Sequence, residues 1–319
     1  MTTTIQPGAG TPDRQPEGKD LADTPQVIRH SKAKSGPGSA SLGVRIVLLL
    51  LCLLWVVPVL GLLISSFRTR DAQFSSGWWS AIANPLDFTQ WTMSNYSQVL
   101  SDNQSGVNMG QAFVNSLIVT IPATVIPILI AAFAAYAFTF MEWKGRDIVF
   151  VLIVGLLVVP NQVALLPILK LYNALGLNGQ FIAVWLAHIG FGMPLAVYIL
   201  RNYMASLPRA VIESAKIDGA SHFTTFWRLI MPMSTPALAS FAIFQFLWVW
   251  NDLLISLIFL GRGDNTIATV ALQGMQGQTG QGRELIPSAG FVTIIIPILV
   301  FLSLQRYFIR GMTSGAVKG

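Results

Sequence analysis

Runs of apolar residues that are long enough to cross a lipid bilayer restrict the fold of this chain more than any other feature. A bilayer-spanning helix needs roughly 20 apolar residues, because each residue rises about 1.5 Å across a hydrocarbon core of about 30 Å. Five runs meet this requirement and a sixth is shorter; they cover about residues 46–65, 112–140, 148–169, 181–200, 236–260 and 288–304. Prolines break the second run at Pro122 and Pro127 and interrupt the sixth at Pro297. We therefore expect an all-α membrane protein with six transmembrane helices.

Composition supports this expectation. Charged residues make up 11% of the chain and hydrophobic residues 53%, whereas a soluble domain carries about 25% charged residues. The formal charge of +6 does not indicate a nucleic-acid partner, because the basic residues lie between apolar blocks and form no stripe. The single cysteine, Cys52, lies inside the first run, so a disulfide within the chain is excluded.

The distribution of lysine and arginine predicts the orientation. The two ends of the chain and the second and fourth connections between runs together hold fifteen of these residues. The first, third and fifth connections hold five. The positive-inside rule then places both termini in the cytoplasm. Residues 1–43 are rich in Pro, Gly, Ser and Thr, so we expect a disordered cytoplasmic tail before a membrane domain over residues 44–319. A secretory signal does not fit, because the polar lead is too long and no cleavage pattern follows the apolar run.

The first external loop, about residues 68–111, contains four aromatic residues: Trp78, Trp79, Trp91 and Tyr96. Such residues are typical of an aromatic belt or of a short helix at the membrane surface. A docking surface for an external partner is the alternative interpretation.

The connection between the fourth and fifth runs, about residues 207–236, has an unusual pattern for a membrane protein loop. Pro208 suits a helix start, residues 209–218 favour a short amphipathic helix, and Gly219 offers a stop. A second helical piece over about residues 222–230 is expected to stop at Met231–Pro232. Two short helices at a glycine elbow form a compact knob suited to a groove on another protein. The alternative is an amphipathic hairpin that rests on lipid headgroups.

This loop resembles the signature loop of the membrane subunits of ATP-binding cassette (ABC) importers, the EAA motif. That motif has Glu-Ala-Ala, then Gly after three further residues, then Ile-x-Leu-Pro. Here it reads Glu213-Ser214-Ala215, Gly219 and Ile230-Met231-Pro232, with Ser214 in place of alanine and Met231 altering the last step.

Other segments resemble the maltose-type carbohydrate branch of these importers. They are Asp218-Gly219-Ala220 with Phe226, Trp250-Asn251-Asp252, and the closing segment 310–319; the resemblance covers about residues 44–319. It implies a permease subunit that imports a sugar or glycoside in the cytoplasmic membrane of a bacterium or archaeon. The implied partners are a second permease subunit, two cytoplasmic ATPase subunits, an extracytoplasmic solute-binding protein, and lipid. ATP and Mg²⁺ would be bound by the ATPase, and this chain would hold no cofactor.

The resemblance also implies that the knob is a coupling helix in a cleft of the ATPase. The expected coupling residues are Glu213, Ser214, Ala215, Asp218, Gly219, Ala220, Phe226, Ile230 and Pro232. The tail after Tyr307 is expected to lie beside the ATPase subunits.

Polar residues within the fifth run suggest a solute pathway, since such groups are costly in lipid. Gln245, Trp248 and Asp252 recur on one helix face, and Asn251 is adjacent. The alternative is that Asp252 lies in water at the outer mouth and that the amides bind neighbouring helices. Asn161 and Gln162 form a weaker candidate after Pro160. His188 is interpreted as a packed histidine without a role.

Three other functions are weighed against this one. A permease for an amino acid, an ion or a peptide is the nearest alternative. A secondary transporter is disfavoured, because the sequence has no internal repeat. A membrane enzyme is disfavoured, because the spans hold no nucleophile–base pair or metal-ligand constellation.

Overall fold

The computed structural model describes residues 41–101, 108–275 and 282–314, and within these ranges every regular element is a helix. One isolated antiparallel bridge joins Arg68 and Trp91. The chain divides into two units between Cys52 and Leu53, inside the first helix α1 (Leu42–Ser66). The described part of the first unit is the exposed beginning of α1, and the second unit holds the other elements. The tail predicted for residues 1–43 lies outside the described residues except at its end, where α1 begins.

In the described ranges, four helices are long and apolar enough to cross a membrane: α1, α5 (Met109–Phe140), α8 (Phe181–Ala205) and the helix formed by η4 (Arg283–Leu285) with α15 (Ile286–Ser314). The number rises to six if each of two sharply bent helix pairs counts as one span. The predicted breaks at Pro122, Pro127 and Pro297 are wrong, since α5 and α15 continue through them. Long membrane helices tolerate proline because neighbouring groups and local adjustments satisfy the freed carbonyl.

The third and fifth apolar runs do not form single straight helices, and this corrects the sequence-based expectation. The third run divides into α6 (Arg146–Gly155), η2 (Leu156–Val158) and α7 (Asn161–Ala174), with a bend of 100°. Pro160 explains this bend, because proline drives the preceding residue out of the helical region, and Val159 is extended. The fifth run divides into α12 (Thr235–Trp250) and α13 (Leu254–Phe259).

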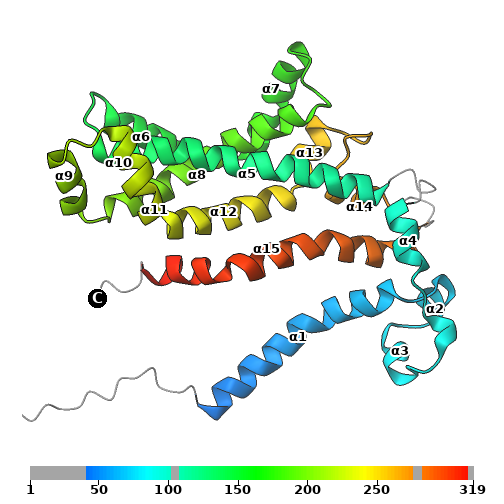
Figure 1. Cartoon of the computed structure of the whole chain (residues 1–319). Coiled ribbons are helices and arrows are strands. Elements are labelled where there is room, and N and C mark those ends of the chain that lie inside the picture. The colour runs from blue at the N-terminus through cyan, green and yellow to red at the C-terminus, as the bar shows by residue number, and fades with distance from the viewer. Residues whose placement is uncertain (1–40, 102–107, 276–281, 315–319) are drawn as a thin grey trace, which may run out of the picture. The chain divides into compact units, whose positions relative to one another are not determined.

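Helices α5 and α8 form the centre of the second unit, and α12 packs on α5 and on α15 (Figure 1). The α5–α8 interface is lined by small side chains, which let the two backbones approach closely. The fully buried examples are Ala123, Ala131, Ala132, Ala135, Ala183 and Ala196.

Short elements occupy the two ends of this bundle (Figure 1). One end, here called the α9 end, carries α9 (Arg209–Ile217), α10 (His222–Thr225), η3 (Phe226–Ile230) and α11 (Met231–Met233). The other, here called the α4 end, carries α2 (Arg70–Ser75), α3 (Trp79–Ala83), η1 (Phe88–Gln90), α4 (Ser94–Ser101) and α14 (Ala268–Gly274).

Candidate functional site at the α9 end

Helix α9 is the amphipathic helix that the sequence predicts. It begins after Pro208, which adopts an extended conformation and cannot itself donate a backbone hydrogen bond. Ile212 and Ala215 are 5% and 8% exposed and face the bundle, where Ile212 joins the apolar cluster between α5 and α8. The remaining side chains of α9 are exposed.

Gly219 forms the elbow at the end of α9. Its φ is +76°, a left-handed conformation that favours glycine. The Gly219 amide donates to the carbonyl of Lys216 and the Ala220 amide to that of Ala215, at 3.0 and 2.9 Å. These two bonds are the Schellman pattern that satisfies the last carbonyls of a helix. The elbow is therefore fixed by backbone conformation and hydrogen bonds.

The second helical piece is longer than expected. Ser221 caps α10 by accepting a hydrogen bond from the Thr224 amide at 3.3 Å. The chain then passes through the π-helical turn η3 and continues as α11 to Met233, so the predicted stop at Met231–Pro232 is wrong. A π-helical turn changes the hydrogen-bond register, and Pro232 falls in the first turn of α11, where an absent N–H costs little.

An aromatic cluster anchors this second piece to the transmembrane helix α5. Phe226 is 2% exposed and stacks on Phe133, with ring centroids 4.4 Å apart. The Tyr136 ring meets Phe226 edge-on at 5.4 Å. The Tyr136 hydroxyl also lies 2.9 Å from Nδ1 of His222 in a hydrogen bond. The second piece of the loop is therefore held to α5 by packed rings and one hydrogen bond.

The predicted coupling residues separate into two groups. Ala215, Phe226 and Ile230 are buried against the bundle, whereas Glu213, Ser214 and Asp218 are exposed on α9 and its end. Two apolar side chains that the sequence analysis did not select are also exposed: Ile217 at 85% and Phe223 at 69%. The exposed side of the knob thus combines apolar and acidic groups with the basic residues Arg209, Lys216 and Arg228.

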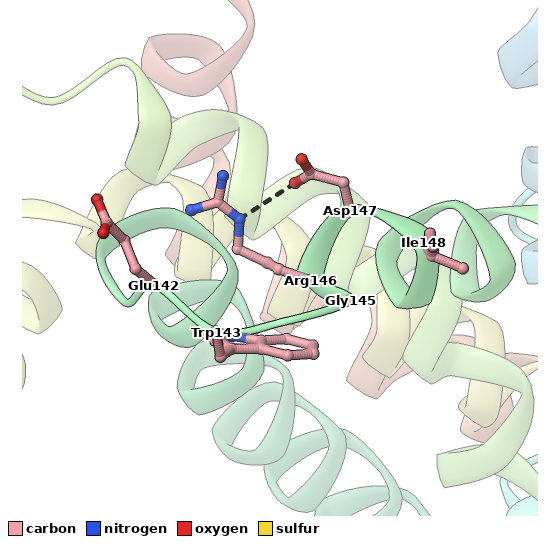
Figure 2. Close-up of a pocket in the computed structure, with 6 residues that line it drawn as sticks. All are labelled: Glu142, Trp143, Gly145, Arg146, Asp147 and Ile148. Atoms are coloured by element: carbon pink, nitrogen blue, oxygen red, sulfur yellow. Dashed lines mark hydrogen bonds and ion pairs between the residues drawn. The ribbon is translucent and has the colours of Figure 1, made fainter.

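Two cavities adjoin the knob. One, of about 330 Å³, lies between α9 and the α5–α6 elbow and is lined in part by Arg209, Glu213 and Lys216. The other, of about 400 Å³, lies at the elbow itself. Figure 2 shows that Arg146 pairs there with the neighbouring Asp147, with Nε and Oδ1 3.1 Å apart. The α5–α6 connection and helix α9 therefore share one polar surface at the α9 end.

Gln245, a predicted pathway residue, is fully buried. Its amide nitrogen donates to the carbonyl of Ala123 in α5 at 3.1 Å. The amide rests against Gly192 of α8, where an added Cβ would lie 2.8 Å from both amide heteroatoms. In this structure Gln245 therefore joins α12 to α5 and α8.

Trp248 and Asp252 lie beside His188 of α8. The Trp248 and His188 rings are 5.3 Å apart, and His188 Nε2 lies 3.7 Å from Asp252 Oδ2. Asp252 accepts hydrogen bonds from the Ile255 and Ser256 amides, so its carboxylate caps the start of α13. Its side chain is only 9% exposed, which differs from a position in water at an outer mouth.

The other predicted pathway residues do not join this group. Asn251 is exposed, and its amide donates to the carbonyl of Leu247 at 2.8 Å. Asn161 and Gln162 begin α7, with no side-chain hydrogen bond to Gln245 or Asp252 among the described residues.

Sequence reasoning missed the residues that link the elements. The hydrogen bond between Tyr136 and His222 joins positions 86 residues apart, and no local pattern marks such a pair. His188 is expected from the sequence to be a packed, hydrogen-bonded histidine; it is fully buried, but both ring nitrogens lack a hydrogen-bond partner in the described part of the chain, so the expected hydrogen bond is wrong. A lone histidine in an apolar span was the available signal, since polar groups there are costly.

Comparison with known proteins identifies the class to which this fold and loop belong. The family of binding-protein-dependent transport system inner membrane components matches residues 127–314. The osmoprotective compounds uptake permease protein GgtD of Synechocystis is 50% identical over 278 residues, which cover 87% of this chain and 92% of the relative. The alpha-glucoside transport system permease protein AglG of Rhizobium meliloti is 39% identical, covering 86% and 97%.

A solved structure of a bacterial alginate ABC transporter in complex with its periplasmic protein contains a chain of the same fold. The TM-score is 0.60 at 14% identity, over 83% of this chain and 93% of that chain. The chain described here belongs to the binding-protein-dependent transport system inner membrane component family, and it is therefore a membrane transport subunit.

Proposed function

We propose that this chain is a transmembrane subunit of an ABC importer that moves a sugar or glycoside across the cytoplasmic membrane. The family match and the alpha-glucoside and arabinooligosaccharide permeases among the relatives support this cargo class. ATP hydrolysis belongs to two separate ATPase subunits. A second permease subunit and an extracytoplasmic solute-binding protein complete the complex.

The anchored knob carries the proposal. Gly219 fixes the elbow, and Phe226 with Tyr136 ties the loop to α5. A partner that displaces the knob would therefore displace a transmembrane helix as a packed unit. Closure of the ATPase pair on ATP would then switch the permease pair between inward-open and outward-open arrangements. In this scheme Glu213 and the exposed Ile217 and Phe223 contact the ATPase.

The orientation follows from this role. The α9 end faces the cytoplasm and the α4 end the exterior, with six spans when each bent pair crosses once and with both termini inside. Six spans, with the exposed apolar side chains of α1 against lipid or the second permease subunit, fit a heteromeric membrane complex.

We assign the pathway residues two tasks. Gln245 is buried and its amide nitrogen donates to Ala123, and Asp252 accepts from the start of α13, so both position helices. Trp248 is half-buried and Asn251 is exposed, so these two are available to a hydroxyl-rich solute or to the second permease subunit. Asn161 and Gln162 at the start of α7 remain candidates for the same surface.

Cysteine labelling tests the orientation. Cys52→Ser removes the native thiol, and Ser214→Cys and Gln98→Cys then each introduce one exposed thiol, on α9 and on α4. With sealed cells and a membrane-impermeant maleimide, we expect Gln98→Cys to react and Ser214→Cys to react only after the membrane is opened. The reverse pattern would overturn the proposed coupling role, because the ATPase could not reach the knob.

Uptake into proteoliposomes tests the cargo. The complex with its ATPase and solute-binding protein is expected to accumulate a labelled saccharide in an ATP-dependent manner. Accumulation of amino acids or peptides in preference to saccharides would contradict the cargo class, and accumulation without ATPase subunits would contradict the transporter class.

A further inference from the structure

The segment between α1 and α4 builds a polar cavity at the α4 end of the chain. The segment curls back on itself through α2 and α3 (Figure 1). The Thr92 amide closes this curl by donating to the carbonyl of Phe67 at 2.7 Å, and the Thr69 amide donates to that of Gln90 at 2.9 Å. The curl lines a half-open cavity of about 530 Å³, within the range of about 300–1,000 Å³ that is usual for small-molecule sites.

Arg68 forms the floor of this cavity. It is 1% exposed, and its terminal nitrogens donate to the carbonyls of Ser76 and Ala72 at 2.9 and 2.7 Å. Its backbone carbonyl accepts hydrogen bonds from Gln73 and Asn95. Burial lowers the pKa of the guanidinium. Arg68 therefore holds the curl in shape from inside.

One donor of Arg68 is left over. Its Nε is buried and has no hydrogen-bond partner in the described part of the chain. A buried donor without a partner costs free energy, typically about 1–3 kcal/mol or more for a charged group. Arg68 lines the cavity while its terminal nitrogens remain bonded to Ser76, Ala72 and Ser80, so it serves the site by holding the shape of the wall.

Two polar side chains in the cavity wall are available to a ligand. The Asp71 carboxylate and the Asn84 amide have no side-chain hydrogen bond among the described residues, whereas Asp87 accepts hydrogen bonds from Thr89. The charged groups sum to −1, from two carboxylates and one guanidinium, so the cavity disfavours anions. Carboxylate, amide and guanidinium groups together both accept and donate hydrogen bonds, as hydroxyl groups require.

We propose that the cavity formed by Arg68, Asp71, Asn84, Asp87 and Gln90 is a binding site for a neutral hydroxyl-rich solute of the saccharide or polyol class. The proposal rests on the proposed function for its external location and its cargo class. The site would hold released cargo beside the outer end of the permease. The small solute is favoured over a protein partner because Asp71 and Asn84 offer hydrogen-bonding groups that are unpaired in the described part of the chain, inside a concave cavity of small-molecule size.

The test is a binding measurement on the intact complex in lipid nanodiscs, without ATP and without solute-binding protein. Maltose, sucrose and trehalose are the neutral probes and glucuronate is the anionic one, followed by saturation-transfer NMR. We expect at least one neutral probe to bind, and glucuronate to bind more weakly. The double variant Asp71→Asn with Asn84→Ala is expected to weaken binding by about tenfold or more, because it removes hydrogen bonds that include a charged acceptor.

Gln98→Ala is the matched control, since Gln98 is an exposed polar residue of α4 outside the cavity. It should bind the probes as the unmodified complex does. The proposal is overturned if no neutral probe binds, or if the double variant binds as well as the control. Co-purification with the solute-binding protein, measured separately, covers the docking alternative: the proposal is also overturned if the double variant loses that association but binds the probes as the control does. ATP-driven saccharide uptake by the unmodified complex, measured in parallel, would leave the proposed function standing in each of these cases.

Discussion

The Tyr136 hydroxyl and Nδ1 of His222 lie 2.9 Å apart, and this hydrogen bond joins the transmembrane helix α5 to the second piece of the coupling loop. The same two rings pack edge-on, with centroids 6.0 Å apart. Under the proposed function, an ATPase that moved the loop would move α5 through both a polar and an apolar contact.

Loss of this hydrogen bond should weaken the linkage without removing the packing. We expect Tyr136→Phe to reduce uptake relative to ATP hydrolysis, because a net hydrogen bond contributes about 0.5–1.5 kcal/mol. Tyr198→Phe is the control, since Tyr198 is an exposed tyrosine of α8 with no side-chain hydrogen bond among the described residues. Equal uptake-to-hydrolysis ratios for the two variants would show that the Tyr136–His222 hydrogen bond does not contribute to coupling.

The close approach of Gly192 to Gln245 gives a second prediction, about stability. Gly192→Ala places a Cβ 2.8 Å from the Gln245 amide, and overpacking of this kind costs about 1–3 kcal/mol. Thermal unfolding of the purified protein should therefore shift downward, and Gln245→Ala in the same chain should recover part of the loss. Gly190→Ala has no atom within 4 Å of the new Cβ and should leave the midpoint unchanged. A neutral Gly192→Ala would mean that the two helices do not pack this closely.

Asp252 is predicted to act as a helix cap. Asn is about as good a cap as Asp, whereas Ala costs about 0.5–2 kcal/mol. We therefore expect Asp252→Asn to keep the unfolding midpoint and the KM for the solute, and Asp252→Ala to lower the midpoint. A large rise in KM for Asp252→Asn at unchanged stability would instead place this carboxylate in contact with cargo.

The sequence predicts the local elements of this fold well and its long-range contacts poorly. Apolar length locates α1, α5, α8 and α15, and Pro208 with Gly219 bounds α9, because these signals act within a few residues. Pro160 is a local signal for the bend in the third run, because proline disfavours helix at the preceding residue Val159. The continuity of α5 through its two prolines depends on the surrounding lipid and helices. Rules based on neighbouring residues in the sequence do not include these surroundings.

The candidate site shows the same division. Glu213 and Gly219 follow from spacing, whereas the partners of Tyr136 and His188 come from distant helices. The helical spacing of Gln245, Trp248 and Asp252 predicts one shared face. Helix α12 ends at Trp250, however, so Asp252 lies beyond the helix where it approaches His188.

The central claim is that the elbow at Gly219 couples ATP hydrolysis to transport, and proteoliposomes that report both rates test it most directly. Gly219→Leu forces a left-handed conformation on a residue that disfavours it by about 1–2 kcal/mol. Gly176→Leu carries the same kind of cost, since Gly176 has φ of +67° and also has open space around it. We predict that Gly219→Leu lowers solute taken up per ATP hydrolysed by about tenfold at normal membrane levels, while Gly176→Leu retains the normal ratio; a normal ratio for Gly219→Leu would contradict the account.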